Sequence, residues 1–393
     1  MEKILVLDGR SRATITIIRS LGRAGKIVYV GEEYKPYSAY SKFCKGFLKY
    51  PSPADEPEAF KNFIKEIINN KKFDAIIPVR DHTTSNLIEM NKDCEYNKYM
   101  CLPSSESYKC AVNKAETIKI ARKLEIPHPR TLIFSYDSYE DENNLEDFIK
   151  DVNFPLILKP AFSSGSRGIV YINNHSELYH KLAKFKEDFK TGLIQEFIPY
   201  GGSFGVEFLF KNGEVKARFT HKRIREYPAS GGPSTCRISV KYPIIEEYSE
   251  KILKFLNWNG VAMVEFRIDS RNNIPMLMEI NPRFWGSLST AYYAGVNFPL
   301  LLADLIIKKD CETIFDYKEG IITRWILWGE LLWFFSKNKN QKLTKDFFNF
   351  FNKDIHDDII DFDDPKPIIG ILVETFTNIF NFRKLKHVFN RGW

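Results

Sequence analysis

Two acidic side chains on neighbouring apolar runs have the clearest chemical potential in this sequence. The runs 261–268 and 274–280 are rich in branched and apolar residues and flank a polar segment. This pattern predicts a β-hairpin with a three-residue loop at 271–273, a register that places Glu265 opposite Glu279. Carboxylates about 5 Å apart destabilise a bare sheet because their charges repel, so the hairpin indicates a cation between them.

A hard divalent cation removes this conflict, because Mg²⁺ prefers oxygen ligands and typically keeps one or two carboxylates together with phosphate oxygens. The period of two along a strand puts Glu279, Asn281 and Arg283 on one face of the second run and its continuation. An exposed hairpin whose acids pair with Arg267 or Arg271 has the same sequence. The hairpin alone therefore leaves both interpretations open.

A lysine at the end of another apolar strand supplies a second candidate. The strand 154–160 delivers Lys159 to a turn rich in serine and glycine, 161–168, which leads into a further strand, 169–172. Amides without bulky side chains can close over a triphosphate, and lysine adds a point charge to the phosphates. An ordinary hairpin loop has the same composition, and the turn lacks the Walker A pattern.

A hinge and a basic stretch follow. The strand 193–198 precedes Pro-Tyr-Gly-Gly, a break typical of a hinge between lobes, and such a strand end can bind adenine through its backbone. The Asn212-Gly213 turn predicts a hairpin that places Glu207 opposite Arg218. The basic run 221–225 is compatible with a solvated surface or with recognition of phosphate and carboxylate, for which arginine is the better ligand.

Composition narrows the class of protein. The chain has 393 residues and a net charge of +7 without a Lys/Arg-rich block, which favours anionic small molecules over nucleic acid. Six cysteines without a C-x-x-C pattern indicate reduced thiols and a cytoplasmic protein. The apolar run 321–335 contains Arg324 and Glu330 and is shorter than the roughly 20 residues of a membrane span. A membrane-surface helix stays open.

The elements that must position these residues begin with an α/β unit. A strand at 3–7, a helix to Ala24 and a strand at 27–30 predict a Rossmann-like domain, although Gly9 alone replaces the dinucleotide fingerprint. Arg80, Asp81 and His82 follow its last strand, where open α/β sheets bind ligands. Substrate contact and a helix start are both open for them.

Helices connect the candidate sites. Ser104 or Ser105 predicts the cap of one helix, and Asn113 with Lys114 opens another. A single helix is expected over 288–307. The aromatic-rich remainder is expected to be an added cap or contact surface in which the tryptophans belong to the core.

The sequence resembles the ATP-grasp superfamily over about residues 1–307, with several motifs in the order and spacing of that superfamily. The motifs that carry the resemblance are Lys114, Lys159 with its loop, the Gln195-Glu196-Phe197-Ile198 hinge, and Glu265 with Glu279-x-Asn281-x-Arg283. The similarity is greatest to the branch with carbamoyl-phosphate synthase, biotin carboxylase and many carboxylate–amine ligases. It implies an α/β fold: a Rossmann-like pre-ATP-grasp domain (1–102), two ATP-grasp lobes (103–190 and 191–307) and a C-terminal extension (308–393).

The resemblance also implies that ATP and Mg²⁺, or Mn²⁺ in its place, bind between the lobes. Adenine would be held at Glu196 and at the Ile198 backbone, and the acid that often binds ribose falls at about Ser203. The implied nucleotide-binding residues are Lys114, Lys159, Ser164, Gly165, Ser166, Gly168, Gln195, Glu196, Phe197, Ile198 and Ser203. The implied metal ligands are Glu265, Glu279 and Asn281, the catalytic residues are Arg283 and Lys159, and the substrate candidates are Arg223, Arg225, Gly231 and Gly232.

The reaction implied by the resemblance is phosphoryl transfer from ATP to a carboxylate, followed by attack of an amine on the acyl phosphate. Small-molecule acids and amines would then be the partners, and a homodimer is open. Two alternatives are a bicarbonate-activating enzyme of the carboxylase or carbamoyl-phosphate type and an ATP-binding module without ligase activity. The sequence shows no biotin-attachment motif and no glutamine-amidotransferase part, which weakens the first alternative.

Overall fold

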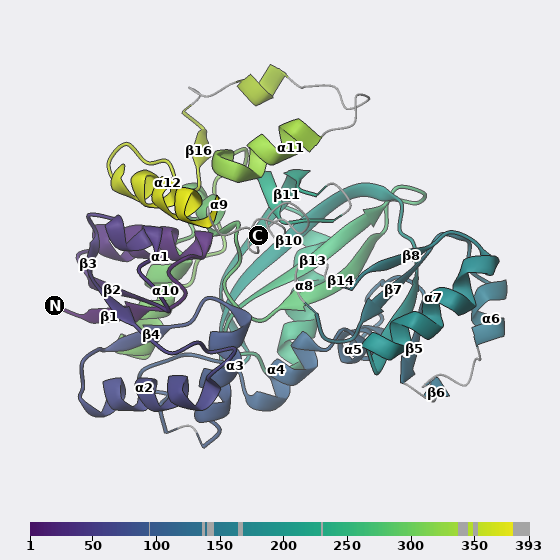
Figure 1. Ribbon diagram of the computed structural model, residues 1–393, viewed down its shortest axis with the longest axis horizontal. Helices are drawn as coiled ribbons and strands as arrows, with labels where there is room; N and C mark the ends of the chain where they lie inside the picture. Colours follow the sequence, from purple (N-terminus) through teal and green to yellow (C-terminus); the bar gives the residue numbers. More distant parts are fainter. Residues whose placement is uncertain are drawn as a thin grey trace.

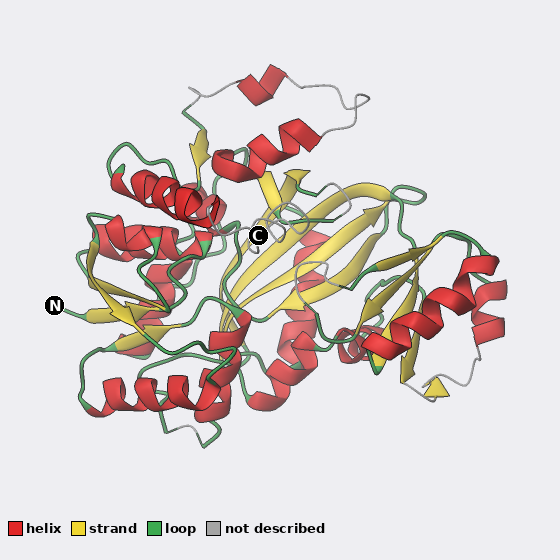
Figure 2. Ribbon diagram, viewed as in Figure 1, coloured by secondary structure: helices red, strands yellow, loops and turns green. Residues whose placement is uncertain are grey.

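Three β-sheets with flanking helices make up the described part of the chain (Figures 1 and 2). They are a four-stranded first sheet, a five-stranded sheet and a seven-stranded sheet, and the last lies between the other two. The computed structural model describes residues 1–93, 95–135, 138–139, 145–163, 168–228, 231–336, 345–348 and 353–379.

The first sheet is parallel throughout, with the order β3-β2-β1-β4. Its apolar strands lie between helices, because βα crossovers cover both faces of a parallel sheet. Helix α3 begins at Asp81, a few residues after β4 ends at Ile77, so the predicted helix start is confirmed. The elements are β1 (Lys3–Val6), α1 (Arg12–Arg23), β2 (Ile27–Glu32), η1 (Tyr37–Tyr40), β3 (Cys44–Lys49), α2 (Pro57–Asn69), β4 (Ala75–Ile77) and α3 (Asp81–Met90).

The five-stranded sheet is antiparallel, with the order β6-β5-β9-β7-β8. Strand β9 pairs with both β5 and β7, so it belongs to the five-stranded sheet. The lobe boundary expected at 190/191 falls between α7 and β9, and hydrogen bonding holds β9 in the same sheet as β7. The elements are β5 (Thr131–Ser135), β6 (Ser138–Tyr139), α6 (Leu145–Lys150), β7 (Leu156–Pro160), β8 (Val170–Ile172), α7 (His175–Asp188) and β9 (Thr191–Glu196).

The seven-stranded sheet has the order β14-β13-β10-β11-β12-β15-β16. One face packs on α4, α5 and α8 through an apolar core, and the other packs on α9, α10 and the first-sheet helix α1. Its strands and covering helices are β10 (Tyr200–Lys211), β11 (Glu214–Glu226), β12 (Ser234–Ser239), β13 (Gly260–Asp269), β14 (Pro275–Asn281), α4 (Ser105–Val112), α5 (Lys114–Lys123), α8 (Pro243–Phe255), α9 (Leu288–Ala294) and α10 (Phe298–Lys308).

The expected single helix over 288–307 was wrong. Gly295 takes a positive φ of 106°, which ends α9 before α10 starts at Phe298. No single helix in the described residues is long and apolar enough to cross a bilayer. Helices α9 and α10 meet that criterion only together, bent by 88°, and their apolar residues belong to the core between the sheets.

The C-terminal extension is part of the seven-stranded sheet, so the expectation of an added cap was wrong. Strand β15 pairs with β12 in antiparallel fashion, and β16 pairs with β15 in parallel. Side chains of Trp325 and Trp333 are buried, as expected for core residues. The elements are β15 (Ile322–Arg324), η2 (Ile326–Glu330), α11 (Leu331–Ser336), η3 (Lys345–Phe348), β16 (Ile355–Asp357) and α12 (Lys366–Ile379).

Two buried acids tie this extension to the rest of the chain, and we call them and their arginines the extension contact. Asp358 pairs with Arg12 at 3.0 Å and with the fully buried Arg237. Asp364 pairs with Arg19 on α1 at 3.0 Å. The extension contact therefore fastens the end of the described chain to both the first sheet and the seven-stranded sheet.

Candidate active site

The predicted opposition of two acids is present in the structure. Strands β13 and β14 pair with Glu265 directly across from Glu279. The three-residue loop was wrong, because the Asp269 N–H donates to the Ile274 carbonyl at 2.9 Å and closes a four-residue loop. A bulge at Met278 takes up the extra residue and restores the predicted register.

Each of the two acids has a cation as its partner, and an amide donates a hydrogen bond to one of them. The Arg223 guanidinium lies 2.6 Å from Oε2 of Glu265, and the Lys114 ammonium lies 3.3 Å from Oε2 of Glu279. The Asn281 amide donates to Oε1 of Glu265 at 3.1 Å. The strands thus bring like charges together, and side chains from other elements compensate for them.

The alternative in which Arg267 or Arg271 pairs with these acids is not what the described contacts show. Arg271 pairs with Asp269 in its own hairpin and lies 3.4 Å from Glu196. Arg271 therefore contacts its own hairpin loop and the hinge instead of the two opposed acids. The charged partners of Glu265 and Glu279 come from β11 and α5.

Helix α5 brings Lys114 to the site. Asn113 caps this helix through a hydrogen bond from the Ala115 N–H at 3.0 Å, as the sequence predicts. The Lys114 N–H donates to the Ala161 carbonyl at 2.9 Å, which pins the helix start to the chain that leaves β7. Since Lys159 is the penultimate residue of β7, this contact places the two lysines side by side.

Burial and neighbouring charges shift the pKa values of these groups. Burial lowers the pKa of Lys159 to about 7, and the charge of Lys114 acts in the same direction. Burial also raises the pKa of Glu265, an effect that Arg223 partly opposes. For Glu279, burial opposes ionisation, but Lys114 and Lys159 outweigh it and lower the pKa. The site therefore favours the ionised form of Glu279, and this carboxylate lies close to Lys114 and Lys159.

The first sheet reaches the same site through Asp81. The Arg283 Nε donates to Oδ1 of Asp81 at 2.8 Å, and its Nη2 donates to Oδ1 of Asn281 at 3.1 Å. Asp81 is the first residue of α3, so it both begins a helix and contacts the predicted catalytic arginine. Both interpretations that the sequence left open for Asp81 are compatible with this geometry.

The predicted adenine hinge is held in place by its side chains. Gln195 is buried and donates to the Thr131 hydroxyl at 2.7 Å. Glu196 accepts the Arg130 N–H at 3.0 Å, while Phe197 packs on Tyr171. Buried Ile198 follows β9. The side chains of the hinge thus have structural partners, and recognition of a ligand through its backbone stays a prediction.

The structure describes only some of the remaining residues that were predicted to bind the nucleotide. Three residues of the predicted loop, Ser164, Gly165 and Ser166, lie outside the described residues. Gly168 has a φ of 74°, and a Cβ there would lie 2.7 Å from Pro160, which explains the glycine. Ser203 is buried on β10 opposite Arg267, so its ribose role stays a prediction.

The two arginines predicted to bind substrate are in different environments. A bulge at Ile224 lies between Arg223 and Arg225 on β11. Arg223 contacts Glu265, whereas Arg225 is buried 2.5 Å from Glu330 in the extension and lies over the Trp333 ring. The structure therefore brings Arg223 to the site and not Arg225.

The two glycines predicted to bind substrate close a turn between β11 and β12. A Cβ on Gly232 would lie 2.0 Å from the Tyr227 carbonyl oxygen, and the Gly232 N–H donates to the Pro228 carbonyl at 2.8 Å. Gly231 has a φ of 125°. Turn geometry therefore accounts for both glycines, and their substrate role stays a prediction.

A buried acid–histidine pair was missed by the sequence interpretation. Glu207 lies opposite Phe219 instead of Arg218, because a bulge at Lys216 shifts the hairpin by one residue. Its Oε1 lies 3.0 Å from Nδ1 of His221. Burial raises the pKa of Glu207 well above its usual value and lowers that of His221 well below. No motif signals this pair, since its register depends on the bulge.

The acid pair and its amide fit a hard divalent cation. Two carboxylates and one amide oxygen are the donor chemistry that Mg²⁺ prefers, with the remaining ligands from phosphate and water. No group of three or more His, Cys, Asp or Glu side chains suited to a metal occurs in the described residues. A cation here would therefore depend on Glu265, Glu279, Asn281 and the ligand's own oxygens.

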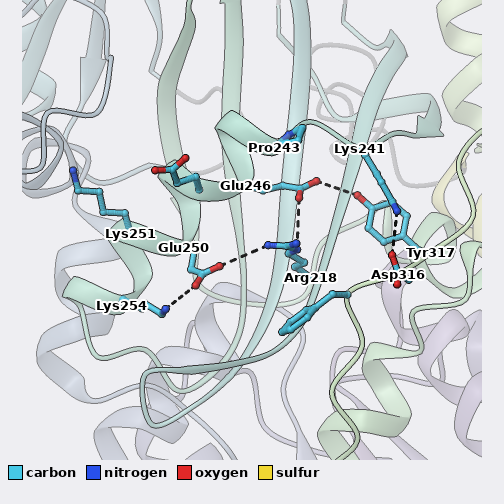
Figure 3. A pocket seen from close by; sticks show the side chains of 11 residues that line it. Arg218, Lys241, Pro243, Glu246, Glu250, Lys251, Lys254, Asp316 and Tyr317 are labelled. Carbon is cyan, nitrogen blue, oxygen red and sulfur yellow. Dashed lines mark hydrogen bonds and ion pairs between the residues drawn. The ribbon is translucent and has the colours of Figure 1, made fainter.

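A separate hollow of about 550 Å³ lies on the α8 face of the seven-stranded sheet (Figure 3). Several charged side chains of its walls are paired with one another: Arg218 lies 3.6 Å from Glu246 and 3.8 Å from Glu250, and Lys241 lies 3.1 Å from Asp316. On β10, Phe208 lies across from Arg218 and Gly205 lies across from Glu265. Because Phe208 and Gly205 are an odd number of residues apart, the side chains of Arg218 and Glu265 face opposite sides of the sheet. This hollow is distinct from the candidate active site.

Part of the chain is similar to proteins of a known family. Residues 111–287 match the family model of the ATP-grasp domain, a segment that contains every predicted nucleotide-binding and metal-binding residue. This segment of the chain is therefore similar to ATP-grasp domains. Among solved structures, it is similar to the biotin carboxylase–β,γ-ATP complex of Campylobacter jejuni, with a TM-score of 0.65 and 15% identity over 82% of this chain and 74% of that chain. This likeness shows that the two chains share a fold.

Two curated relatives add named activities. The chain is 28% identical over 243 residues to the formate-dependent phosphoribosylglycinamide formyltransferase of Sulfurisphaera tokodaii, covering 56% of this chain and 57% of that protein. It is 26% identical over 183 residues to the D-alanine–D-alanine ligase of Carboxydothermus hydrogenoformans, covering 44% of this chain and 58% of that protein. The chain thus spans little more than half the length of these relatives.

Proposed function

We propose that this chain is an ATP-dependent carboxylate–amine ligase that forms ADP and an acyl-phosphate intermediate. One observation carries the proposal: α5, β7, β13 and β14 bring two lysines and two opposed acids into one cluster in which Lys114 contacts Glu279. A structural ion pair needs only one of these acids. The relatives named above, one of which joins two D-alanines by name, support ligation as the reaction class.

ATP would lie between the five-stranded and seven-stranded sheets. Lys159 and Lys114 would contact its phosphates, since both are held at the mouth of the loop that follows β7. Phosphate would replace Glu279 as the partner of Lys114 and would stabilise the charged form of Lys159. The backbone at Glu196 and Ile198 would bind adenine, because the hinge side chains are already engaged.

Magnesium, or manganese in its place, would be held by Glu265, Glu279 and Asn281 and would supply neutralisation of the phosphate charge during transfer. Arg223 would leave Glu265 for a substrate carboxylate or phosphate, because its planar fork suits both. Arg283 would stabilise charge on the transferred phosphoryl group, and Asp81 orients its guanidinium from the first sheet. The loop after β7 would exclude water and protect the acyl phosphate.

The proposal is tested by screening pools of carboxylic acids and amines for ADP release, with mass detection of the condensed product. The active pair then serves to compare two variants. Glu279→Gln should lower ADP formation by about a hundredfold to a thousandfold, the range expected when a group that stabilises transition-state charge is removed. Glu312→Gln changes an exposed acid outside the site and should leave the rate unchanged.

Each alternative has its own result in this screen. ADP release that requires bicarbonate and no amine would favour carboxylation or carbamoyl transfer. Binding of ATP without any acid-dependent or bicarbonate-dependent turnover would favour a non-catalytic module. If Glu279→Gln turned over at the parental rate with the active pair, the assignment of this acid would be wrong.

A further inference from the structure

His221 belongs to a row of residues that runs across the seven-stranded sheet from the two opposed acids. Gly205 on β10 lies directly across from Glu265 on β13 and directly across from His221 on β11. Residues that lie across from one another point to the same face of a sheet. The side chains of His221 and Glu265 therefore share the face on which the candidate active site lies.

The glycine in the middle of this row makes room for the imidazole ring. A Cβ at Gly205 would lie 2.4 Å from Cε1 and 3.1 Å from Nδ1 of His221. The ring therefore lies over β10, the strand between β11 and β13, and so extends towards Glu265. A larger residue at position 205 would displace the ring, which gives this glycine a physical reason.

Glu207 fixes one edge of the ring. Its Oε1 lies 3.0 Å from Nδ1 of His221 and accepts the Ser287 hydroxyl at 3.1 Å. Ser287 follows Arg283 by a few residues, so one segment of the chain positions both this acid and the predicted catalytic arginine. A carboxylate at Nδ1 favours the tautomer that carries its proton on Nδ1, which leaves Nε2 able to accept a proton.

The packing of the protein gives the second ring nitrogen no partner. Nε2 of His221 is buried, and no hydrogen bond to it is present in the part of the chain that the structure describes. A buried polar atom without a partner costs about 1–3 kcal/mol, so packing alone does not favour a histidine at this position. A nitrogen of this kind on the active-site face is suited to a bound substrate.

The charges around the pair favour the uptake of one proton. Burial raises the pKa of Glu207 well above its usual value, and Ser287 and Arg237 only partly oppose this effect. Burial lowers the pKa of His221 well below its usual value, and the charges of Arg223 and Arg237 act in the same direction. When Nε2 takes up a proton, transfer of the Nδ1 proton to Glu207 leaves both buried groups neutral.

We propose that His221, supported by Glu207, is the proton acceptor for the amine in the ligase reaction proposed above, on which this inference rests. The amine nitrogen forms a bond to the acyl carbon, the bond from that carbon to the phosphate oxygen breaks, and phosphate leaves with the electron pair. The proton of the amine passes to Nε2 of His221, and the Nδ1 proton passes to Oε1 of Glu207.

Arg223 links access to the ring with binding of the substrate. It lies two residues from His221 on the same face of β11 and contacts Glu265. When Arg223 leaves Glu265 for a substrate carboxylate or phosphate, it would uncover the edge of the ring. The amine would then reach Nε2 only after the first substrate is in place.

Hydroxylamine separates this step from the rest of the reaction. It is unprotonated at neutral pH and attacks acyl phosphates without a base, so the hydroxamate reports formation of the acyl phosphate alone. With the acid and amine found in the screen, His221→Gln and Glu207→Gln should each lower amide formation by about a hundredfold to ten-thousandfold, the usual contribution of a positioned base. Hydroxamate formation and the KM for ATP should stay near the parental values.

Ser239→Ala is the matched control. Ser239 is buried and continues the same row on β12, directly across from His221. Its hydroxyl donates to the Lys318 carbonyl at 2.7 Å, away from the pair, so both products should form at parental rates. Melting curves show whether each variant folds, and Glu207→Gln, which keeps the shape of the side chain, decides the outcome if His221→Gln does not fold.

Two results would overturn this inference alone. They are parental amide formation by both variants, and equal losses of amide and hydroxamate, which indicate a structural role for the pair. In both cases a parent that forms ADP and hydroxamate still supports the ligase proposal. A parent that forms neither product would overturn the ligase proposal and this inference with it.

Discussion

The candidate active site and the extension contact use the same types of residue in opposite arrangements. At the active site, backbone pairing places one acid directly across from another, and the cations that compensate come from α5 and β11. In the extension contact, each acid lies across from arginines, and Asp358 and Arg237 are both fully enclosed. Like charges that lie across from one another can take a cation between them, whereas opposite charges that pair with one another hold the chain together.

This comparison predicts that removing an acid from the candidate active site lowers activity, whereas removing an acid from the extension contact lowers stability. Glu265→Gln should lower ADP formation by about a hundredfold to a thousandfold, because a ligand for the cation and a partner of Arg223 are lost. Its free energy of unfolding should change little, since the substitution also relieves repulsion between Glu265 and Glu279. Steady-state kinetics and urea unfolding on the same samples check both parts. A large loss of stability would place this acid in the same class as Asp358.

The opposite result is expected for Asp358→Asn. This change leaves Arg237 buried without its counter-charge and should lower the free energy of unfolding by about 3–5 kcal/mol. Urea unfolding measures the loss, and ADP formation per folded molecule should stay near the parental rate at low temperature. Asp316→Asn is the matched control, because Asp316 is exposed and its pair with Lys241 is solvated. A comparable loss in the control would contradict the argument from burial.

Two arginines separated by one residue sharpen the comparison further. Arg223→Gln should reduce ADP formation about tenfold to a hundredfold, because a cation at the reacting groups is removed. Arg225→Gln should instead lower the free energy of unfolding by about 1–3 kcal/mol, because its partner Glu330 is buried in the extension. Kinetics and unfolding of both variants decide the matter. The assignment of the two arginines would be reversed if Arg225→Gln were the slower enzyme with unchanged stability.

The smallest expected effect concerns the pH dependence of stability at Lys159. Its pKa is about 7 in the folded protein and near 10.5 in the unfolded chain, so unfolding takes up a proton between these pH values. The contribution of this group to the free energy of unfolding therefore rises with pH across that window. Lys159→Met removes this dependence, and its melting temperature should exceed the parental one most at pH 6 and progressively less towards pH 10. A difference independent of pH would contradict a lowered pKa.

Much of the local geometry could be predicted from the sequence. The opposition of Glu265 and Glu279, the cap at Asn113 and the delivery of Lys159 by an apolar strand all follow from periodicities and capping rules that act within a few residues. The register of Glu207 could not be predicted, because a bulge inserts one residue and moves every later pairing. The same limit made the prediction of a three-residue loop between β13 and β14 wrong, although a bulge at Met278 restored the predicted register.

What the sequence by itself determined is which strands carry the acids and lysines and which residue begins α5, since each depends on local preferences for dihedral angles and side-chain alternation. Only the tertiary structure decided which charges meet: Lys114 with Glu279, Arg283 with Asp81, Arg223 but not Arg225 with Glu265, and the extension with the seven-stranded sheet. These contacts join segments up to hundreds of residues apart. Their energies depend on burial and on neighbouring charges, neither of which exists until the sheets pack together.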